Sequence, residues 1–578
     1  MNTLPIVLAC TGLLVVSGCS SGDRAPAAPA APAAPAASSA PAAAAGAQAE
    51  PRPQLFDGIG PHSRKVATLS PEGQRYFDQG LAFAFAFNHD EARRAFLAVT
   101  EIDPESPMGF WGLAYCQGAH INNPIVPPER ERSAWTAAQR ALALSERASP
   151  ADRALIAAVS RRYADPPATD RAPLDKAYAE AMREAWSSYP DDADVGALCA
   201  EALMDLHPWD LWTADGQPKD GTLEIVAMLD DVLRLDPQHP GALHLDIHAV
   251  EASSDPGRAL AAADRLRALM PVSGHMLHMP SHIDVLLGHW DEAIACNQRS
   301  LAADAAYCAV RPEQDFHHVY MAHNRQMLAF AAMMDGRQAL ALEAADGIAP
   351  GVPDEYARRQ TAFIEPYLLI PYDTYVRFGL WDRILAEPPP PDYLLIKTAL
   401  WHFARGVALA ATGRVPEAEA EAARLREATE RIPADRFMAI NPAHNVLAIA
   451  ERVLDGEIAY RKGDIDTAVA TLREAAQLED GLVYMEPPEW VLPVRHTLGA
   501  ILLTSGRVDE AEAAYRDDLA QWPDNGWSLY GLSECLKSRG PPAEIAARQA
   551  TEQFERAWAD ADVTIGASCL CVAKPTAR

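Results

Sequence analysis

The sequence predicts an all-α fold, a solenoid of stacked helix pairs. The first observation is a recurring order of small residues, large apolar residues and proline, at the period of about 34 residues that is typical of helical repeat arrays. The second is that no stretch of any length alternates apolar and polar residues as a strand does. The third is composition: 49% of the 578 residues are hydrophobic and 22% are charged, which suffices for a long core. Together they favour one solenoid over about residues 60–560.

An apolar segment opens the chain. Leu4–Val16 is apolar but too short to cross a membrane as an ordinary helix, and Val16-Ser17-Gly18-Cys19 closes it. The segment is typical of an export signal, and its last four residues resemble the lipobox of bacterial lipoproteins. We therefore expect a signal peptide over residues 1–18 and a lipid group on Cys19. The predicted location is the periplasmic side of the bacterial cell envelope, anchored at the outer membrane.

A linker and a helical domain follow the signal. Residues 19–53 are dominated by Ala and Pro, which predicts a semi-extended tether without a core. Residues 54–578 are the predicted helical repeat domain. The net charge of −29 argues against a nucleic-acid partner and against binding to an anionic membrane by charge. The predicted membrane contact is therefore through the lipid anchor only.

Two stretches carry the repeat pattern most fully, Tyr76–Pro104 and Arg495–Pro523. Small residues allow two helices to approach closely, an aromatic residue fills the seam, and proline ends the second helix because it cannot donate a backbone hydrogen bond. The marker residues are Gly80, Phe83, Ala92, Phe96 and Pro104 in the first stretch, and Leu498, Gly499, Leu502, Ala511, Tyr515 and Pro523 in the second. Weaker copies are marked by Gly456, Ala468 and Leu472, and by Gly406, Leu409 and Ala418. The pattern resembles the tetratricopeptide repeat (TPR) and predicts a TPR-like α-solenoid of helix-turn-helix pairs.

Between these units the pattern weakens. We expect degenerate helical pairs and insertions over residues 120–235 and 340–400. The run Pro388–Pro391 predicts a stiff loop, since consecutive prolines cannot form a helix.

Histidines cluster near the middle of the repeat domain. Residues three and four apart share a helical face, so a set at i, i+4 and i+7 and a set at i, i+3 and i+7 each point one way. The first set is His244, His248 and Glu251, the second is His275, His278 and His282, and His323 follows on the next predicted helix. In TPR arrays the first helix of each pair lines the concave surface. The resemblance therefore implies that three consecutive helices direct imidazoles into one stretch of groove.

Converging imidazoles predict a metal site. Helices packed about 8–10 Å apart allow side chains from neighbours to meet on one ion. The predicted ligands of a transition metal (Zn, Fe, Mn or Cu) are His244, His248, His275, His278, His282 and His323. Glu251 is predicted to act as a catalytic base on metal-bound water, or else as a further ligand. Two alternatives stay open: a metal-free groove that binds a peptide or protein, and hydrogen-bonded structural histidines.

Other polar residues carry less weight, because helix ends, loops and core packing explain them more simply. They are Glu201, Asp205, His207, Trp209 and Asp210; His120, Asn122 and Asn123; and Glu486, Glu489, Trp490 and Arg495. The sequence has no GxSxG, GxGxxG, Walker or HExxH motif. Nucleotide binding and the common nucleophilic mechanisms therefore lack support.

Six segments between about residues 80 and 535 carry a wider resemblance. They are GLAFAFAFNHDEARRAF (80–96), EALMDLHPW (201–209), HLDIHAVEAS (244–253), GHMLHMPSHI (274–283), YMEPPEW (484–490) and NGWSLYGL (525–532). Together they resemble a family of bacterial TPR-repeat proteins, many of them exported, whose function is poorly defined. The resemblance implies the fold and no particular reaction. The leading hypothesis is thus a lipid-anchored periplasmic TPR protein with a metal-binding, histidine-lined groove, an enzyme being one outcome. The alternative is a metal-free TPR scaffold for a peptide or envelope protein.

Overall fold

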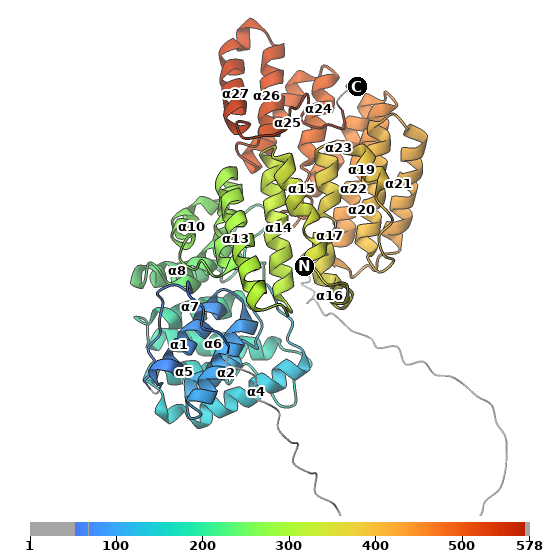
Figure 1. The fold of residues 1–578 in the computed structure, drawn as a ribbon. Coiled ribbons are helices and arrows are strands. Elements are labelled where there is room, and N and C mark those ends of the chain that lie inside the picture. The colour runs from blue at the N-terminus through green and yellow to red at the C-terminus, as the bar shows by residue number, and fades with distance from the viewer. Residues whose placement is uncertain (1–52, 68, 573–578) are drawn as a thin grey trace, which may run out of the picture. The chain divides into compact units, whose positions relative to one another are not determined.

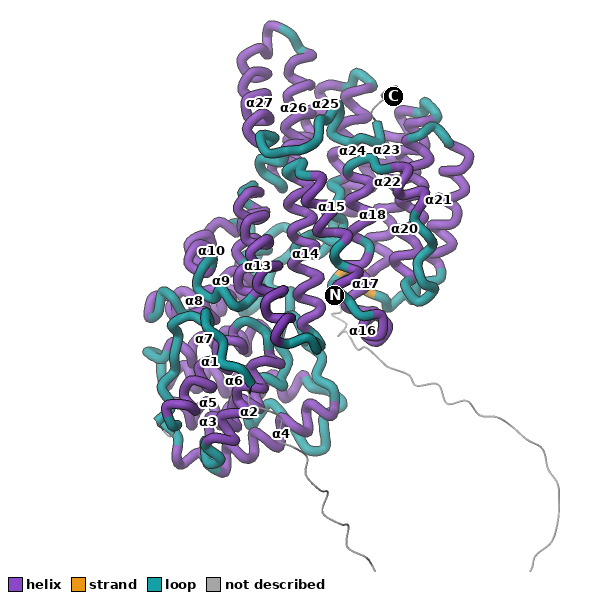
Figure 2. Tube along the Cα trace, viewed as in Figure 1, coloured by secondary structure: helices purple, strands orange, loops and turns teal. Residues whose placement is uncertain are grey.

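The computed structural model describes residues 53–67 and 69–572 (Figure 1). The predicted signal peptide (1–18) and lipidated Cys19 lie outside the described residues, and so does the predicted linker up to residue 52. Arg52–Arg578 form one compact unit. Figure 2 shows that its regular structure is almost wholly helical, which confirms the all-α prediction.

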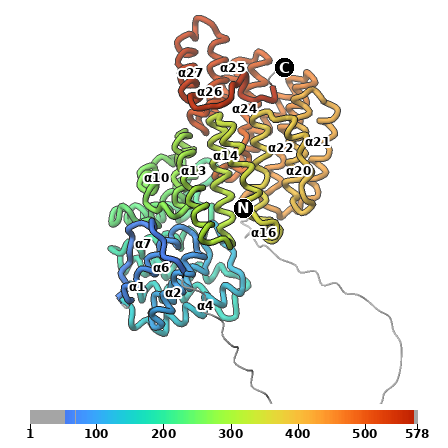
Figure 3. Tube along the Cα trace, viewed as in Figure 1, coloured from blue at the N-terminus to red at the C-terminus, as the bar shows by residue number. Residues whose placement is uncertain are grey.

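The first part of the unit, blue to green in Figure 3, is a series of helices joined by loops of varied length. Each of α1, α3 and α5 begins with a serine whose hydroxyl caps the helix and with a proline in the first turn. The elements are α1 (Pro71–Phe85), α2 (His89–Ile102), α3 (Pro107–Tyr115), α4 (Pro128–Ala143), η1 (Ser145–Arg147), α5 (Pro150–Val159), α6 (Ala172–Ser188), α7 (Ala193–Met204) and α8 (Thr222–Leu235). The expected degenerate pairs over residues 120–235 are therefore helical.

The middle part carries the predicted histidines. Its elements are α9 (Pro240–Val250), η2 (Pro256–Ala259), α10 (Leu260–Leu266), α11 (Gly274–His278), α12 (Pro280–Leu286), α13 (Trp290–Val310), α14 (His317–Met334) and α15 (Gln338–Asp346). Within it, α12 packs against α9, while α11 packs against both α13 and α14. Segments that are distant in sequence thereby bring their histidines together.

The last part is again built from helix pairs, with one short hairpin. Its elements are η3 (Ala349–Gly351), α16 (Asp354–Arg359), α17 (Thr361–Leu368), α18 (Ile370–Arg377), α19 (Trp381–Ala386), α20 (Leu395–Ala411), α21 (Val415–Glu430), β1 (Phe437–Met438), β2 (Asn441–Pro442), α22 (Ala443–Arg461), α23 (Ile465–Asp480), α24 (Val494–Thr504), α25 (Val508–Gln521), α26 (Gly526–Ser538), η4 (Pro541–Ala543) and α27 (Glu544–Ala557). The antiparallel pair β1–β2 is too short for a sequence pattern to reveal. Pro388–Pro391 lies in the loop between α19 and α20, as predicted.

The helix seams follow the predicted repeat pattern. A side chain added at Gly80 would come within 2.8 Å of the Phe96 ring, and one added at Gly499 would come within 2.5 Å of the Tyr515 ring. Ala511, on the facing helix α25, is fully buried. The small residues therefore allow α1 to pack on α2 and α24 on α25, and the prediction of TPR-like helix pairs is confirmed.

The core of the unit consists of two large apolar clusters and a small third one that includes Tyr372 and Ile384. One contains residues between 66 and 320 and the other contains residues between 285 and 572. Helices α12 and α14 contribute to both, so they lie where the clusters meet. Cys569 and Cys571 form a disulfide. Among the described residues, no helix is both long enough and apolar enough to span a membrane.

Candidate metal centre

Helix α9 carries three of the predicted site residues. His244 and His248 lie one turn apart, and Glu251 is the residue at the C-terminal end of the helix. The helix starts at His239, whose Nδ1 accepts a backbone hydrogen bond, and Pro240 occupies the first turn, where no amide partner is required. With this start, the spacing of three and four residues places both imidazoles and the carboxylate on one side of α9.

Helices α11 and α12 together carry three more. His275 and His278 lie on α11, and His282 lies on α12. Met279 between the helices has helical dihedrals, φ −49° and ψ −40°, and Pro280 occupies the first turn of α12. The proline therefore removes no hydrogen bond that the chain needs at that point, and His278 and His282 keep the same-face spacing of a continuous helix.

The imidazoles are enclosed, whereas the sequence predicted an open concave groove. His323 on α14 completes the group, and the six histidines and Glu251 are each exposed by 7% or less. Aromatic rings cover them: Phe87 lies 4.4 Å from His244, Trp209 lies 5.3 Å from His248, and Tyr320 lies 4.5 Å from His275, between ring centroids. The groove prediction is corrected here for a physical reason. Aromatic side chains from separate segments fill the space that a regular solenoid would leave to solvent.

The six histidines form two groups of ligand atoms, and His248, Glu251 and His282 form a third that overlaps both. His244, His248 and His275 make one set of three imidazoles, and His278, His282 and His323 make the other. In each set, one ring nitrogen per histidine lies within 4.8 Å of the others. We call these sets the first and second histidine sets. Glu251 joins them, because its Oε1 bonds His248 and its Oε2 bonds His282.

Four of the rings have their Nδ1 atoms bound to an acceptor. His244 Nδ1 lies 2.7 Å from the carbonyl oxygen of Phe85, and His278 Nδ1 lies 2.7 Å from Oδ1 of Asn297, whose amide group donates elsewhere. His248 and His282 donate from Nδ1 to Glu251, at 2.8 and 2.5 Å. Carbonyl and carboxylate oxygens only accept, so the proton of each ring lies on Nδ1. The Nε2 atoms are then left with lone pairs, as in histidines that bind metals.

The Nε2 atoms face one another at short range. The Nε2 atoms of His278 and His282 are 2.8 Å apart, those of His244 and His275 are 3.1 Å apart, and those of His282 and His323 are 3.5 Å apart. For His278 and His282, both protons are on Nδ1, so two lone pairs meet with nothing between them. The ligands of an ion with bonds of about 2.0–2.1 Å lie about 2.9–3.6 Å apart at bond angles of 90–120°. The spacing is that of nitrogens arranged around a cation.

Electrostatics disfavour the charged form of four of these rings. Burial, followed by repulsion from neighbouring imidazoles, lowers the pKa of His244, His275 and His278 well below the ordinary value. The same causes lower the pKa of His323 to about 3. Burial favours protonation of Glu251, but the His282 and His248 rings outweigh it and lower the pKa of this carboxyl to about 2. Neutral imidazoles beside an ionised carboxylate are the protonation states that metal binding requires.

Two strained residues contact the first histidine set. Phe87 and Trp209 have positive φ angles of 55° and 59°, in the left-handed region that residues with large side chains rarely adopt. Phe87 packs on His244 and His275, and Trp209 packs on His248. Strain of this kind costs about 1–3 kcal/mol per residue and gathers at functional sites. Its location here supports a functional role for the buried rings.

Some of the less favoured candidates do lie beside the centre. The His120 ring stacks on Phe87 at 4.6 Å, and Asn122 accepts a hydrogen bond of 3.1 Å from the Trp209 indole. His207 lines a small cavity with His248. Asn123 only exchanges backbone hydrogen bonds with His120.

Other candidates serve networks of their own. Glu201 accepts from the Tyr115 hydroxyl and Asp205 accepts from Arg162. Asp210 pairs with Lys219, Glu489 accepts from Asn441, and Arg495 pairs with Asp480, while Trp490 is a core residue. Glu486 is fully buried and accepts from the Tyr484 hydroxyl. None of these side chains bonds to the six histidines. Their structural interpretation is therefore the simpler one, as the sequence indicated.

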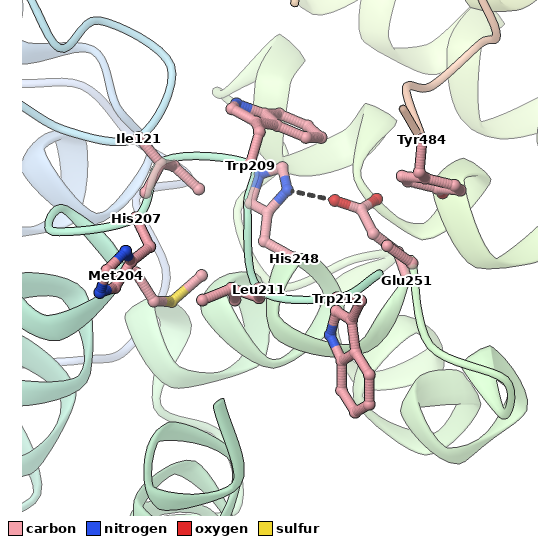
Figure 4. Close-up of a pocket in the computed structure, with 10 residues that line it drawn as sticks. Ile121, Met204, His207, Trp209, Leu211, Trp212, His248, Glu251 and Tyr484 are labelled. Carbon is pink, nitrogen blue, oxygen red and sulfur yellow. Dashed lines mark hydrogen bonds and ion pairs between the residues drawn. The ribbon is translucent and has the colours of Figure 1, made fainter. Parts of the chain in front are cut away.

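Two cavities adjoin Glu251. A cavity of about 20 Å³ is lined by His248, Glu251 and apolar side chains that include Trp209 and Leu211 (Figure 4). A cleft of about 610 Å³ lies beside it, with Trp490 among its lining residues. Both cavities share the wall made by Glu251, Ala252 and Tyr484. Small molecules thus have room next to the first histidine set, and larger ones have room on the other side of this wall.

A further histidine group, His62, Asp194 and His239, is explained by structure alone. Asp194 bonds both imidazoles and also pairs with Arg64, while His239 caps α9. These contacts tie the segment before α1 to α7 and α9. The ring nitrogens already have partners, in contrast to the Nε2 atom of His248, which has none.

Sequence reasoning missed Phe85, Phe87, Asn297 and Tyr484. Phe85 and Phe87 belong to a segment that was recognised as part of a repeat, and nothing in that pattern marks a carbonyl or a ring for a site 159 residues away. Asn297 sits inside α13 and looks like any polar helix residue. The motif YMEPPEW does contain Tyr484, and it is the one signal that could have pointed to this residue.

Comparisons with known proteins show little beyond the fold. No protein-family model and no curated protein matches the chain. Similar solved structures include human IFIT1 with m7Gppp-AAAA (11% identity, 85% of this chain and 91% of that chain, TM-score 0.31) and yeast Tom70 (10% identity, 84% and 90%, TM-score 0.27). A Rap protein complexed with competence and sporulation factor is also similar (12% identity, 64% and 95%, TM-score 0.31). All three are TPR-containing proteins. At these identities and scores, the likeness carries no argument about ligand, reaction or location.

Proposed function

We propose that this chain is a transition-metal protein whose metal is bound by His244, His248, His275, His278, His282 and His323. The observation that supports it most is the contact of 2.8 Å between the Nε2 atoms of His278 and His282, both of which carry lone pairs. In a buried site such lone pairs repel unless a cation lies between them. Of the predicted metals Zn, Fe, Mn and Cu, imidazole ligands suit Zn, Fe and Cu best.

The surroundings of the rings support the same proposal. Acceptors on Nδ1 fix the tautomer and orientation of metal-binding histidines, and they raise the basicity of the ligand atom. Four of the six rings have such acceptors, contributed by Phe85, Asn297 and Glu251. A purely structural histidine cluster would instead satisfy its Nε2 atoms, and the Nε2 atom of His248 is buried without a partner.

Within this proposal Glu251 positions two ligands. Both of its oxygens accept from imidazoles, so the carboxylate would have to release one of them to act as a base on bound water. A metal-dependent reaction remains part of the proposal, because the small cavity gives a molecule access to His248 and Glu251. The lipid anchor on Cys19 and the periplasmic location are also proposals, since they depend on the N-terminal motif alone.

Substitution of one ring from each set tests the metal. The double variant His248→Ala, His282→Ala should lose bound metal while its helical circular dichroism stays that of the wild type. His289→Ala is the matched control, because this imidazole is partly exposed on the loop before α13. Metal is measured by elemental analysis of protein purified without a histidine tag. Wild-type protein without stoichiometric metal, even after growth in metal-replete medium, would refute the proposal.

The alternative function is that of a metal-free scaffold for a peptide or protein. The cleft of about 610 Å³, with Trp490 and Trp522 among its lining residues, is the feature that favours it. In that case the His248→Ala, His282→Ala variant should bind its partner as the wild type does, and added metal should leave the melting temperature unchanged.

A further inference from the structure

The number of imidazoles exceeds what one ion uses. Sites for zinc and related ions take about four protein or water ligands, and here six histidines converge. A single ion with four ligands would leave at least two of the six imidazoles unused at the metal. Two ions would use all six rings. The number of ligands therefore favours a pair of ions.

The contacts divide the rings in the same way. Among the described residues, every Nε2–Nε2 contact of 3.5 Å or less joins two rings of the same set. The ring centroids are no farther apart between the sets (5.5 Å for His248 and His282) than within them (6.5 Å for His248 and His275), so the two sets adjoin each other. The Nε2 contacts alone divide the rings, and each set offers three nitrogens to its own ion.

The charge around the rings limits the charge of the ions. In the part of the chain that the structure describes, Glu251 is the one carboxylate bonded to any of the six imidazoles. Glu486 is a second buried carboxyl near Glu251, but it bonds to Tyr484 and burial raises its pKa, so it favours the neutral form. With Glu251 as the one bonded carboxylate, two divalent ions leave three uncompensated positive charges at the rings, whereas two monovalent ions leave one. Uncompensated buried charge is costly, so monovalent ions fit this site better.

Copper is the transition metal that meets these conditions. Copper(I) is monovalent, and imidazole is among the ligands that suit copper. Magnesium, calcium and manganese prefer oxygen ligands, which neither set supplies directly. The apolar cover of Phe87 and Trp209 also favours the lower charge, since an apolar shell stabilises the less charged oxidation state.

The small cavity indicates the size of what can reach the first histidine set at His248. At about 20 Å³ it holds one molecule of the size of water, and its walls are largely apolar, with Ile121, Leu211 and Trp209 among them. A small apolar molecule such as a diatomic gas suits this space. Dioxygen is small and apolar. Two copper(I) ions can bind it without any other reactant, since each ion gives one electron, both become copper(II), and dioxygen takes up the two electrons.

We propose that the centre holds two copper(I) ions, one in each histidine set, and that the pair binds one molecule of dioxygen. The inference rests on the proposed function, because it specifies the metal, the number of ions and the ligand of the same site. It assigns one role to the two histidine sets and another to Glu251. Each set holds one ion, and the carboxylate orients one ring of each.

Metal stoichiometry tests the pair. Full-length protein without a tag is stripped with a chelator, loaded with copper(I) under anaerobic conditions and measured by elemental analysis. Wild type and the control His289→Ala should bind two ions per chain. His244→Ala, His275→Ala should bind one, and so should His278→Ala, His323→Ala. Helical circular dichroism shows whether each variant folds. If a variant does not fold, the number of copper ions bound per wild-type chain still tests the pair.

The outcomes separate this inference from the proposed function. One copper ion per wild-type chain would overturn the pair and leave the metal proposal standing, whereas no bound metal of any kind would overturn both. If zinc(II) displaced copper(I) from both sets in equimolar competition, the assignment of copper(I) as the metal would be overturned.

Dioxygen is tested on the loaded protein. Admission of oxygen to the dicopper(I) protein should consume one dioxygen per two copper ions, with a new absorption band from copper(II). The variants that keep one ion should not consume one dioxygen per two copper ions, and they should not develop this absorption band. A fully loaded wild-type protein that takes up no dioxygen would overturn this part of the inference.

Discussion

Glu251→Gln is the most informative single substitution, because the carboxylate accepts from two imidazoles at once. Its Oε1 lies 2.8 Å from His248 Nδ1 and its Oε2 lies 2.5 Å from His282 Nδ1. Glutamine has nearly the same shape but only one acceptor oxygen. One imidazole keeps its partner, and the other faces an NH₂ group. That second ring must move its proton to Nε2, which removes the lone pair that binds the metal.

The expected loss can be estimated in two ways. A hydrogen bond to a charged group contributes about 1.5–3 kcal/mol. At 1.4 kcal/mol per tenfold, this corresponds to a fall in affinity of about 10- to 150-fold. Loss of an acceptor on a metal-binding histidine typically lowers metal affinity 10- to 100-fold, which agrees. Because His248 and His282 belong to different sets, one set should weaken by this factor and the other should stay close to wild type.

Competition with a chromophoric chelator measures both affinities. Glu365→Gln is the matched control, since Glu365 is a buried carboxylate that accepts from two backbone amides and Arg436 without contacting the six histidines. It should lower the free energy of unfolding and leave metal affinity unchanged. Glu251→Gln protein that binds every ion within threefold of wild type would refute the tautomer argument.

Three further predictions follow from the scaffold and the termini. Ala511→Trp should lower the free energy of unfolding by about 1–3 kcal/mol in urea titration, because Ala511 is fully buried in the seam of α24 and α25, whereas Ala513→Trp on the exposed side should not. Burial raises the pKa of Glu457 to about 8, so the folded chain keeps a proton that the unfolded chain releases above about pH 4.5, and stability falls as the pH rises through this window. Glu457→Gln should remove this loss, gaining about 3 kcal/mol relative to wild type between pH 4.5 and 7, and the exposed Glu474→Gln should gain nothing. Cys19→Ala, outside the described residues, should abolish lipid labelling and release the protein from membranes; unchanged fractionation would refute the anchor.

The fold was predictable because its signals are local. Gly80 and Phe96 are sixteen residues apart and meet across one helix turn helix unit, so a short pattern captures the contact. The same holds for Gly499 and Tyr515. The shared faces of His244 with His248 and of His278 with His282 also follow from helical spacing alone. What these histidines bind stays a prediction.

The enclosure of the rings was not predictable from the sequence. It depends on Phe87, Trp209 and Tyr484, which reach the centre from segments far apart in the chain. A glycine often indicates a left-handed backbone in a sequence, but the residues with this conformation here are Phe87 and Trp209. A solenoid register specifies which face of a helix points inward, but it cannot specify whether later segments cover that face.

The order of the helices explains how one stretch of chain can build two sets. α12 packs against α9 and α11 packs against α14, so α11–α12 lies between the other two histidine-bearing helices. His275 and His278, three residues apart on α11, go to different sets, and three residues advance a helix by about 4.5 Å. This rise accounts for most of the 6.0 Å between their ring centroids. The separation of the sets is therefore fixed by the backbone of a single helix rather than by loops, and Glu251 links both sets from α9. A centre built in this way keeps its spacing when surface loops vary, so the distance between its two ions would be a property of the repeat scaffold itself.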